Sequence, residues 1–88
     1  MTTSERILRH VQRVFRSDGP ITSNSRLAAD LDAGIVDLKD LCLRIERDLD
    51  LKLNAAALLA AIRAGGDSAT VHWLAAHIAA TRSGEAEQ

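Results

Sequence analysis

The sequence predicts a single all-α domain, on the evidence of its length, its composition and the spacing of its apolar residues. The chain has 88 residues, enough for one compact core but not for two. It is 47% hydrophobic but only 2% aromatic, and contains a single proline, a composition that favours helices over strands. We therefore expect one domain over residues 1–88, with an ordered core at about 4–80 and a flexible tail at 82–88.

The first helix is expected to begin after Thr2, because Glu5 follows three residues later in the pattern that satisfies the first backbone amides of a helix. Its buried face should comprise Ile7, Leu8, Val11, Val14 and Phe15, whose spacing follows one side of a helix. The helix should end near Ser17, because Asp18-Gly19-Pro20 favours a helix stop.

A long polar loop is expected between the first and second helices, over residues 21–34. Its isolated apolar residues are Ile21, Leu27 and Leu31. Long loops in small domains are usually functional or held down by their own buried side chains. We expect these three residues to pin the loop to the core.

The second helix is expected over residues 36–48. Its buried stripe should comprise Leu38, Leu41, Cys42, Ile45 and Leu49. Val36 and Leu43 fall outside that stripe and form a second, weaker apolar line, with Lys39, Asp40 and Arg47 beside it.

A third, short helix should start after Asn54 and end at Gly65-Gly66, and Asp67 or Ser68 should cap a fourth helix. The apolar residues expected to be buried in these two helices are Leu58, Leu59, Ile62, Val71, Leu74, Ala75 and Ile78.

The balanced charge and the lack of long apolar runs argue against several classes of function. Eleven basic residues against twelve acidic ones give a net charge of −1, which argues against a nucleic-acid partner. No apolar run is long enough to cross a membrane or to act as an export signal, so we expect no membrane partner and a cytoplasmic location. The single Cys42 has no partner for an internal disulfide, which fits a reducing compartment.

Four short stretches, taken in order, carry a family resemblance. They are ERILRHV at residues 5–11, SRLAADL at 25–31, IERDLDLKL at 45–53 and SATV at 68–71. Together they resemble the acyl carrier protein family, over about residues 4–80. The resemblance implies a four-helix bundle with three long helices, one short helix and a long loop between the first and second.

The chain departs from that family at the position that carries its chemistry. In the family, an Asp-Ser-Leu triplet opens the second helix and its serine carries a phosphopantetheine arm. The matching residues here are Gly34-Ile35-Val36, and Ile35 has no hydroxyl, so we expect no cofactor. The serines of the chain lie elsewhere, at Ser4, Ser17, Ser23, Ser25, Ser68 and Ser83.

No arrangement typical of catalysis or metal binding is found. Cys42 lies on the buried stripe, where a free cysteine usually acts as a small apolar residue rather than a nucleophile. His72 and His77 are five residues apart and point to different faces of one helix. We therefore expect neither enzymatic activity nor a metal site.

Two features are open to a structural or a functional interpretation. Trp73 lies beside the apolar face of the last helix, as a residue at the edge of the core or as a partner contact. The first helix has a basic edge, which is either a solvated face or a contact for an acidic partner; it comprises Arg6, Arg9, Arg13 and Arg16.

The first hypothesis is a non-catalytic protein-interaction module without phosphopantetheine. Its expected contact residues are Ile35, Val36, Lys39, Asp40, Leu43 and Arg47. The resemblance implies enzymes of fatty-acid or polyketide-type metabolism as the partners that it would regulate or scaffold. Against this, Ile35 and Val36 are open to a second interpretation: drift after loss of the serine, or burial under the preceding loop.

The sequence leaves two alternatives open. One is a true acyl carrier that is modified at a serine other than the usual one. The other is a small helical DNA-binding protein, which the balanced charge disfavours.

Overall fold

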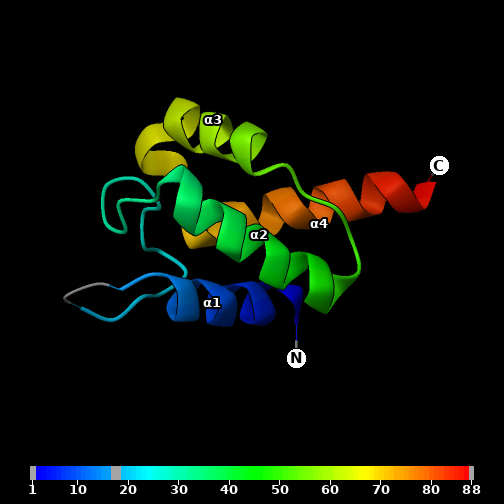
Figure 1. Ribbon diagram of the computed structural model, residues 1–88, viewed down its shortest axis with the longest axis horizontal. Helices are drawn as coiled ribbons and strands as arrows, with labels where there is room; N and C mark the ends of the chain where they lie inside the picture. The colour runs from blue at the N-terminus through cyan, green and yellow to red at the C-terminus, as the bar shows by residue number, and fades with distance from the viewer. Residues whose placement is uncertain (1, 17–18, 88) are drawn as a thin grey trace.

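Four α-helices and no strand make up the described part of the chain, which confirms the predicted all-α class (Figure 1). The computed structural model describes residues 2–16 and 19–87, and their side chains up to residue 81. The helices are α1 (Thr3–Val14), α2 (Ile35–Leu49), α3 (Ala55–Gly65) and α4 (Val71–Glu87), and a single 3-10 turn, η1, spans Gly66–Ser68.

Helix α2 lies in the middle of the fold and packs against α1 on one side and α3 on the other (Figure 1). Helix α4 packs against α1. The chain direction in α1 is roughly opposite to that in α2 (Figure 1). In residues 2–16 and 19–87, no helix is both long enough and apolar enough to cross a membrane.

Helix α1 begins as predicted. The backbone N–H of Glu5 donates a hydrogen bond to the Thr2 hydroxyl at 3.2 Å, which satisfies one of the amides that the first turn leaves unpaired. Of the five residues predicted to form its buried face, Ile7, Val11 and Phe15 are buried, whereas Leu8 and Val14 are half-buried at its edge. The helix ends at Val14, and the predicted end near Ser17 lies outside the described residues.

The loop between α1 and α2 is held against the start of α4 by backbone hydrogen bonds. The Leu27 N–H donates to the Ala69 carbonyl at 2.9 Å, and the Val71 N–H donates to the Ser25 carbonyl at 3.0 Å. Leu27 and Leu31 are buried and Ile21 is half-buried. The sequence prediction of a pinned loop is therefore confirmed, and the bond from the Val71 N–H also satisfies an amide of the first turn of α4.

Helix α2 buries all five residues of its predicted stripe, from Leu38 to Leu49. It ends at Leu49, and the next residue, Asp50, takes the left-handed conformation with φ of 53°. The carboxylate of Glu46 then accepts a hydrogen bond from the Leu53 N–H at 2.8 Å. This bond ties the connection between α2 and α3 to the side of α2.

The predicted cap of α3 is confirmed, whereas that of α4 is wrong. The Asn54 side chain accepts a hydrogen bond from the Ala57 N–H at 3.0 Å. For α4, the residue that caps is Thr70, whose hydroxyl accepts from the Trp73 N–H at 3.2 Å, rather than Asp67 or Ser68. Asp67 and Ser68 both lie in η1. The carbonyl of the next residue, Ala69, accepts a hydrogen bond from the loop, and α4 begins only at Val71, later than the sequence suggested.

The last helix also extends further than expected. The sequence predicted a flexible tail over 82–88, but the backbone of α4 continues as helix to Glu87. Gln88 lies outside the described residues.

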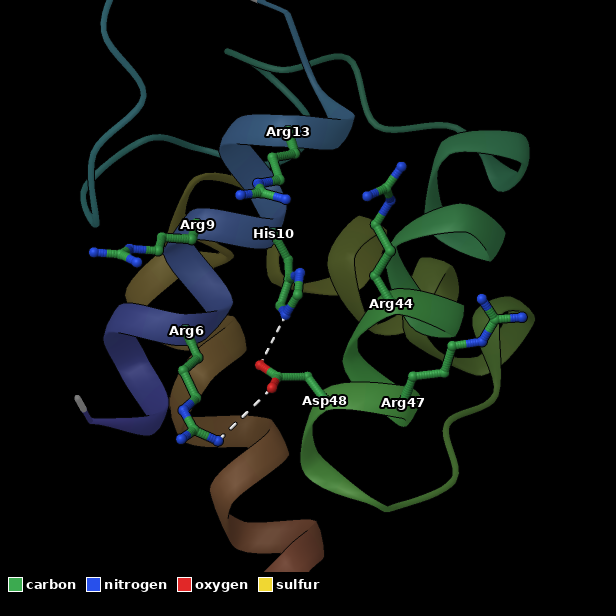
Figure 2. A pocket seen from close by; sticks show the side chains of 7 residues that line it. All are labelled: Arg6, Arg9, His10, Arg13, Arg44, Arg47 and Asp48. Atoms are coloured by element: carbon green, nitrogen blue, oxygen red, sulfur yellow. Dashed lines mark hydrogen bonds and ion pairs between the residues drawn. The ribbon is translucent and has the colours of Figure 1, made fainter.

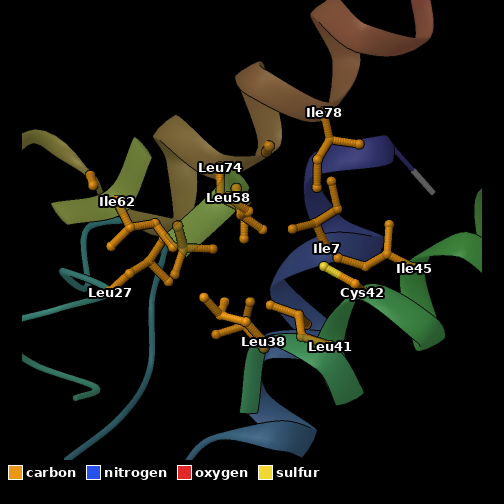
Figure 3. Close-up of a cluster of buried hydrophobic side chains, with 14 of the residues drawn as sticks. Ile7, Leu27, Leu38, Leu41, Cys42, Ile45, Leu58, Ile62, Leu74 and Ile78 are labelled. Carbon is orange, nitrogen blue, oxygen red and sulfur yellow. The ribbon is translucent and has the colours of Figure 1, made fainter. Parts of the chain in front are cut away.

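One apolar core joins the four helices and the loop (Figure 3). Ile7 from α1, Cys42 and Ile45 from α2 and Ile78 from α4 meet in one part of it, and Leu27 of the loop lies beside Ile62 of α3 in another (Figure 3). No buried residue of the described chain is polar or charged. The core therefore depends on apolar packing alone.

Replacing Leu27 by alanine tests whether the loop is part of the core. We expect the free energy of unfolding to fall by about 2 to 5 kcal/mol, because the substitution leaves a cavity beneath a fully buried side chain. Urea denaturation followed by circular dichroism measures this change. The control is Leu43→Ala at an exposed position, which should change stability by less than about 0.5 kcal/mol. Equal losses for the two variants would contradict the assignment.

Candidate protein-interaction site

The exposed large apolar residues of the described chain all lie on α2. Ile35 is 36% exposed, Val36 76% and Leu43 53%. We call these three residues the apolar patch. Their exposure rules out burial of Val36 under the preceding loop, which was one of the two structural interpretations of the sequence.

The patch is exposed because of the way that α2 is oriented. The five buried residues of α2 face α1, α3 and α4, so residues on the opposite side of the helix face outward. Val36 and Leu43 are seven residues apart and therefore lie two turns apart on the same outward side. The exposed charged residues Lys39, Asp40 and Arg47 occupy intervening or following turns of that side. The structure thus brings five of the six predicted contact residues onto one face of α2, while Ile35, in the first turn, lies on the flank of the helix about 100° around the axis from Val36.

Two of the charges beside the patch are uncompensated. Asp40 forms an ion pair with Arg44 at 3.1 Å, one turn further along the exposed side of α2. Lys39 and Arg47 form no ion pair with another described residue. Of the three charged contact residues, the two that lack an ion pair with a described residue are therefore both basic.

A small hollow of about 280 Å³ opens next to the patch, between α2 and the start of α3. It is lined by Lys39, Cys42, Leu43, Glu46, Leu53 and Ala55. Leu43 belongs to both the patch and the hollow, so the two form one continuous surface with an apolar floor.

Cys42 lies beneath this hollow and acts as a core residue. It is 3% exposed, and burial raises the pKa of its thiol to about 11, with a further contribution from the nearby Glu46 carboxylate. The thiol is therefore protonated at neutral pH. Since the thiolate is the reactive form, Cys42 is a poor nucleophile in the folded protein.

The position that the sequence resemblance pairs with an attachment serine, Ile35, lies at the exposed start of α2. Gly34 precedes the helix and supplies no side-chain cap, and Ile35 is the first helical residue. The described serines lie elsewhere: Ser4 is in the first turn of α1, Ser23 and Ser25 are in the pinned loop, and Ser68 is in η1. Ser17 is outside the described residues, and the side chain of Ser83 is not described.

The histidines do not gather into a metal site. Among the residues that the structure describes, no group of three or more histidine, cysteine or acidic side chains is placed to hold a metal ion. His77 instead stacks on Trp73, with ring centroids 5.2 Å apart, and Trp73 is partly buried against the core. This places Trp73 at the edge of the core.

A second surface feature combines residues that the sequence did not connect. A groove of about 590 Å³ lies between α1 and α2 (Figure 2). It is lined by Arg6, Arg9, His10, Arg13, Arg44, Arg47 and Asp48. The sequence predicted the basic edge of α1, but only the packing of α1 against α2 adds Arg44 and Arg47 to it.

Comparison of the chain with models of known families, with characterised proteins and with solved structures found no match. The resemblance to acyl carrier proteins therefore stays a prediction from the sequence. The candidate site depends on the exposure, packing and charge described above.

Alkylation of Cys42 tests its assignment to the core. At neutral pH we expect iodoacetamide to modify the folded protein far more slowly than the protein in urea, because the thiol is buried and its pKa of about 11 leaves almost no thiolate. Mass spectrometry over time measures both rates. Equal rates with and without urea would show that the thiol is accessible in the native state.

Proposed function

We propose that this chain is a non-catalytic protein-interaction module with the architecture of an acyl carrier protein but without phosphopantetheine. It binds a protein partner through the outer face of α2. The observation that carries the proposal is the exposure of Ile35, Val36 and Leu43 on one helix of a domain whose other large apolar side chains, within the described residues, are buried or half-buried.

The apolar patch supplies the favourable free energy of binding. Full burial of a Val, Leu or Ile side chain is worth roughly 1.5 to 3 kcal/mol. Much of this energy is not gained within the folded chain, because Val36 and Leu43 remain more than half exposed to water. A partner that covers the patch gains it, as is usual at the centre of a protein interface.

The charges beside the patch supply orientation and specificity. Lys39 and Arg47 are exposed and have no ion pair within the described chain, so they are free to meet acidic groups on a partner. The partner surface that fits is an apolar area with carboxylates at its edge. Its identity as an enzyme of fatty-acid or polyketide-type metabolism follows from the sequence resemblance alone.

The start of α2 supports a role without a covalent arm. Ile35 offers no oxygen for a phosphodiester, and the Ser25 hydroxyl in the loop accepts a hydrogen bond from the Thr22 N–H at 2.9 Å. A bulky apolar side chain at this exposed position is suited to a dry contact instead.

Charge introduced into the patch should abolish binding to the partner. We expect Ile35→Asp and Val36→Asp to lose the proteins that the wild-type chain captures from its own cell extract, because a carboxylate in an apolar contact pays a large desolvation cost. Quantitative mass spectrometry of the captured proteins provides the measurement.

The matched control for this experiment is Ala79→Asp, at an exposed position on α4. It should capture the same proteins as the wild type, and circular dichroism should show unchanged helical content in all three variants. Undiminished capture by both patch variants would refute the proposed site.

Incubation with coenzyme A and a phosphopantetheinyl transferase tests the absence of the arm. We expect the intact mass of the protein to stay unchanged, because no described serine lies at the start of α2. As a companion variant, Ile35→Ser should gain the mass of one phosphopantetheine if the surrounding surface is recognised. A mass gain by the wild-type protein would show that it is a true carrier.

A further inference from the structure

The groove between α1 and α2 concentrates positive charge that the overall composition conceals. Five arginines and one aspartate line it, which gives the groove four net positive charges with His10 neutral. Because the whole chain has a net charge of −1, the remainder of the molecule carries five net negative charges. The groove is therefore a basic site on an otherwise acidic protein.

The one acidic residue in the groove is shared by two of its basic neighbours. The Asp48 carboxylate forms a hydrogen bond with His10 Nε2 at 2.9 Å, and it forms an ion pair with Arg6 at 3.7 Å (Figure 2). The hydrogen bond with His10, together with the charge of Arg6, holds the pKa of Asp48 below its usual value. The single negative charge of Asp48 is thus paired with Arg6 and His10, at one end of the groove.

The other arginines of the groove are left without an acidic partner inside it. Arg44 pairs with Asp40, which is not part of the lining. Arg9, Arg13 and Arg47 form no ion pair with any described residue. The ring nitrogen Nδ1 of His10 is shielded from solvent and has no hydrogen-bond partner among the described residues.

This arrangement does not stabilise the isolated domain. Arg9 and Arg13 are four residues apart on α1, a spacing at which like charges repel and weaken a helix. Arg13 of α1 and Arg44 of α2 add positive charge on opposite walls of the same groove (Figure 2). An anion in the groove relieves this repulsion.

The shape of the groove selects among anions. In Figure 2, Arg9 and Arg47 extend outward on the two sides, away from the centre of the groove, so the guanidinium groups do not converge on one small ion. From Arg6 to Arg13 the groove follows two turns of α1, roughly 10 Å along the helix axis. A short ligand with several separated negative charges therefore fits better than one phosphate.

Carboxylates on a helix match this spacing. The basic residues of α1 in the lining are spaced three and four residues apart, and a partner helix with acids at the same spacing presents them along one side. Arginine also binds carboxylates through two parallel hydrogen bonds. A long nucleic acid fits less well, because beyond the groove its phosphates would meet the negatively charged remainder of the protein.

We propose that the groove between α1 and α2 binds an acidic helical segment of a protein, about two turns long, with carboxylates at three- and four-residue spacing. This surface is distinct from the apolar patch, and the two share only Arg47 as a flanking charge.

The test uses a synthetic alanine-rich peptide of about 25 residues that carries glutamates at this spacing over its central two turns, because isolated helices shorter than about 12 to 15 residues are marginal in water. Fluorescence anisotropy measures its binding to the full chain at low salt. We expect saturable binding that weakens as salt is raised, because exposed charges are screened. A peptide with glutamine in place of each glutamate should not bind, and absence of binding by the glutamate peptide would overturn the proposal.

Variants of the groove locate the binding. The double variant Arg9→Gln/Arg13→Gln should bind the glutamate peptide about fivefold to tenfold more weakly, because it removes two unpaired cations. Asp48→Asn should bind it more tightly, because it removes the one acid of the lining. Equal binding by either variant and the wild type would contradict the assignment.

Two controls separate this site from general attraction and from the apolar patch. Arg63→Gln removes an exposed cation on α3, outside the groove, and should leave binding unchanged. Ile35→Asp should also leave peptide binding close to that of the wild type, so that failure of the patch proposal does not affect this result. Tighter binding of a DNA duplex or of inorganic phosphate than of the glutamate peptide would show that the ligand class is wrong.

Discussion

The orientation of α2 about its own axis is the constraint on which the rest of the structure depends. Five apolar side chains, from Leu38 to Leu49, are buried against neighbouring elements and allow only one orientation of the helix. Once that orientation is set, Val36 and Leu43 face solvent, while Arg44 and Arg47 line the groove beside α1. Both surfaces discussed above follow from the burial of one stripe, because the faces of a helix cannot turn independently.

The pinned loop allows α2 to lie between α1 and α3. It connects α1 to an α2 that runs in roughly the opposite direction, and it gains rigidity from buried Leu27 and from backbone bonds to Ala69 and Val71. These bonds also complete the start of α4, so the loop and that helix depend on each other. Ordering a loop of this length costs conformational entropy, and the buried side chains and backbone hydrogen bonds offset that cost.

The two faces of α2 differ in the physics that a ligand would exploit. The apolar patch offers area whose burial is favourable at any salt concentration, while the groove offers charges whose effect declines with ionic strength. Arg47 flanks both. One helix thus presents a contact suited to a dry interface and another suited to an acidic segment, on a domain whose net charge is only −1.

By itself the sequence determined the helical class, the buried stripe of α2, the caps at Thr2 and Asn54 and the anchors of the loop, because each depends on residues close together in the chain. Only the tertiary structure decided that Thr70 caps α4, because the Ala69 carbonyl bonds to the loop and the helix begins after that residue. It also decided that Arg44 and Arg47 join the basic edge of α1. That juxtaposition depends on how two helices, separated by a long loop, pack together, and no local pattern encodes it.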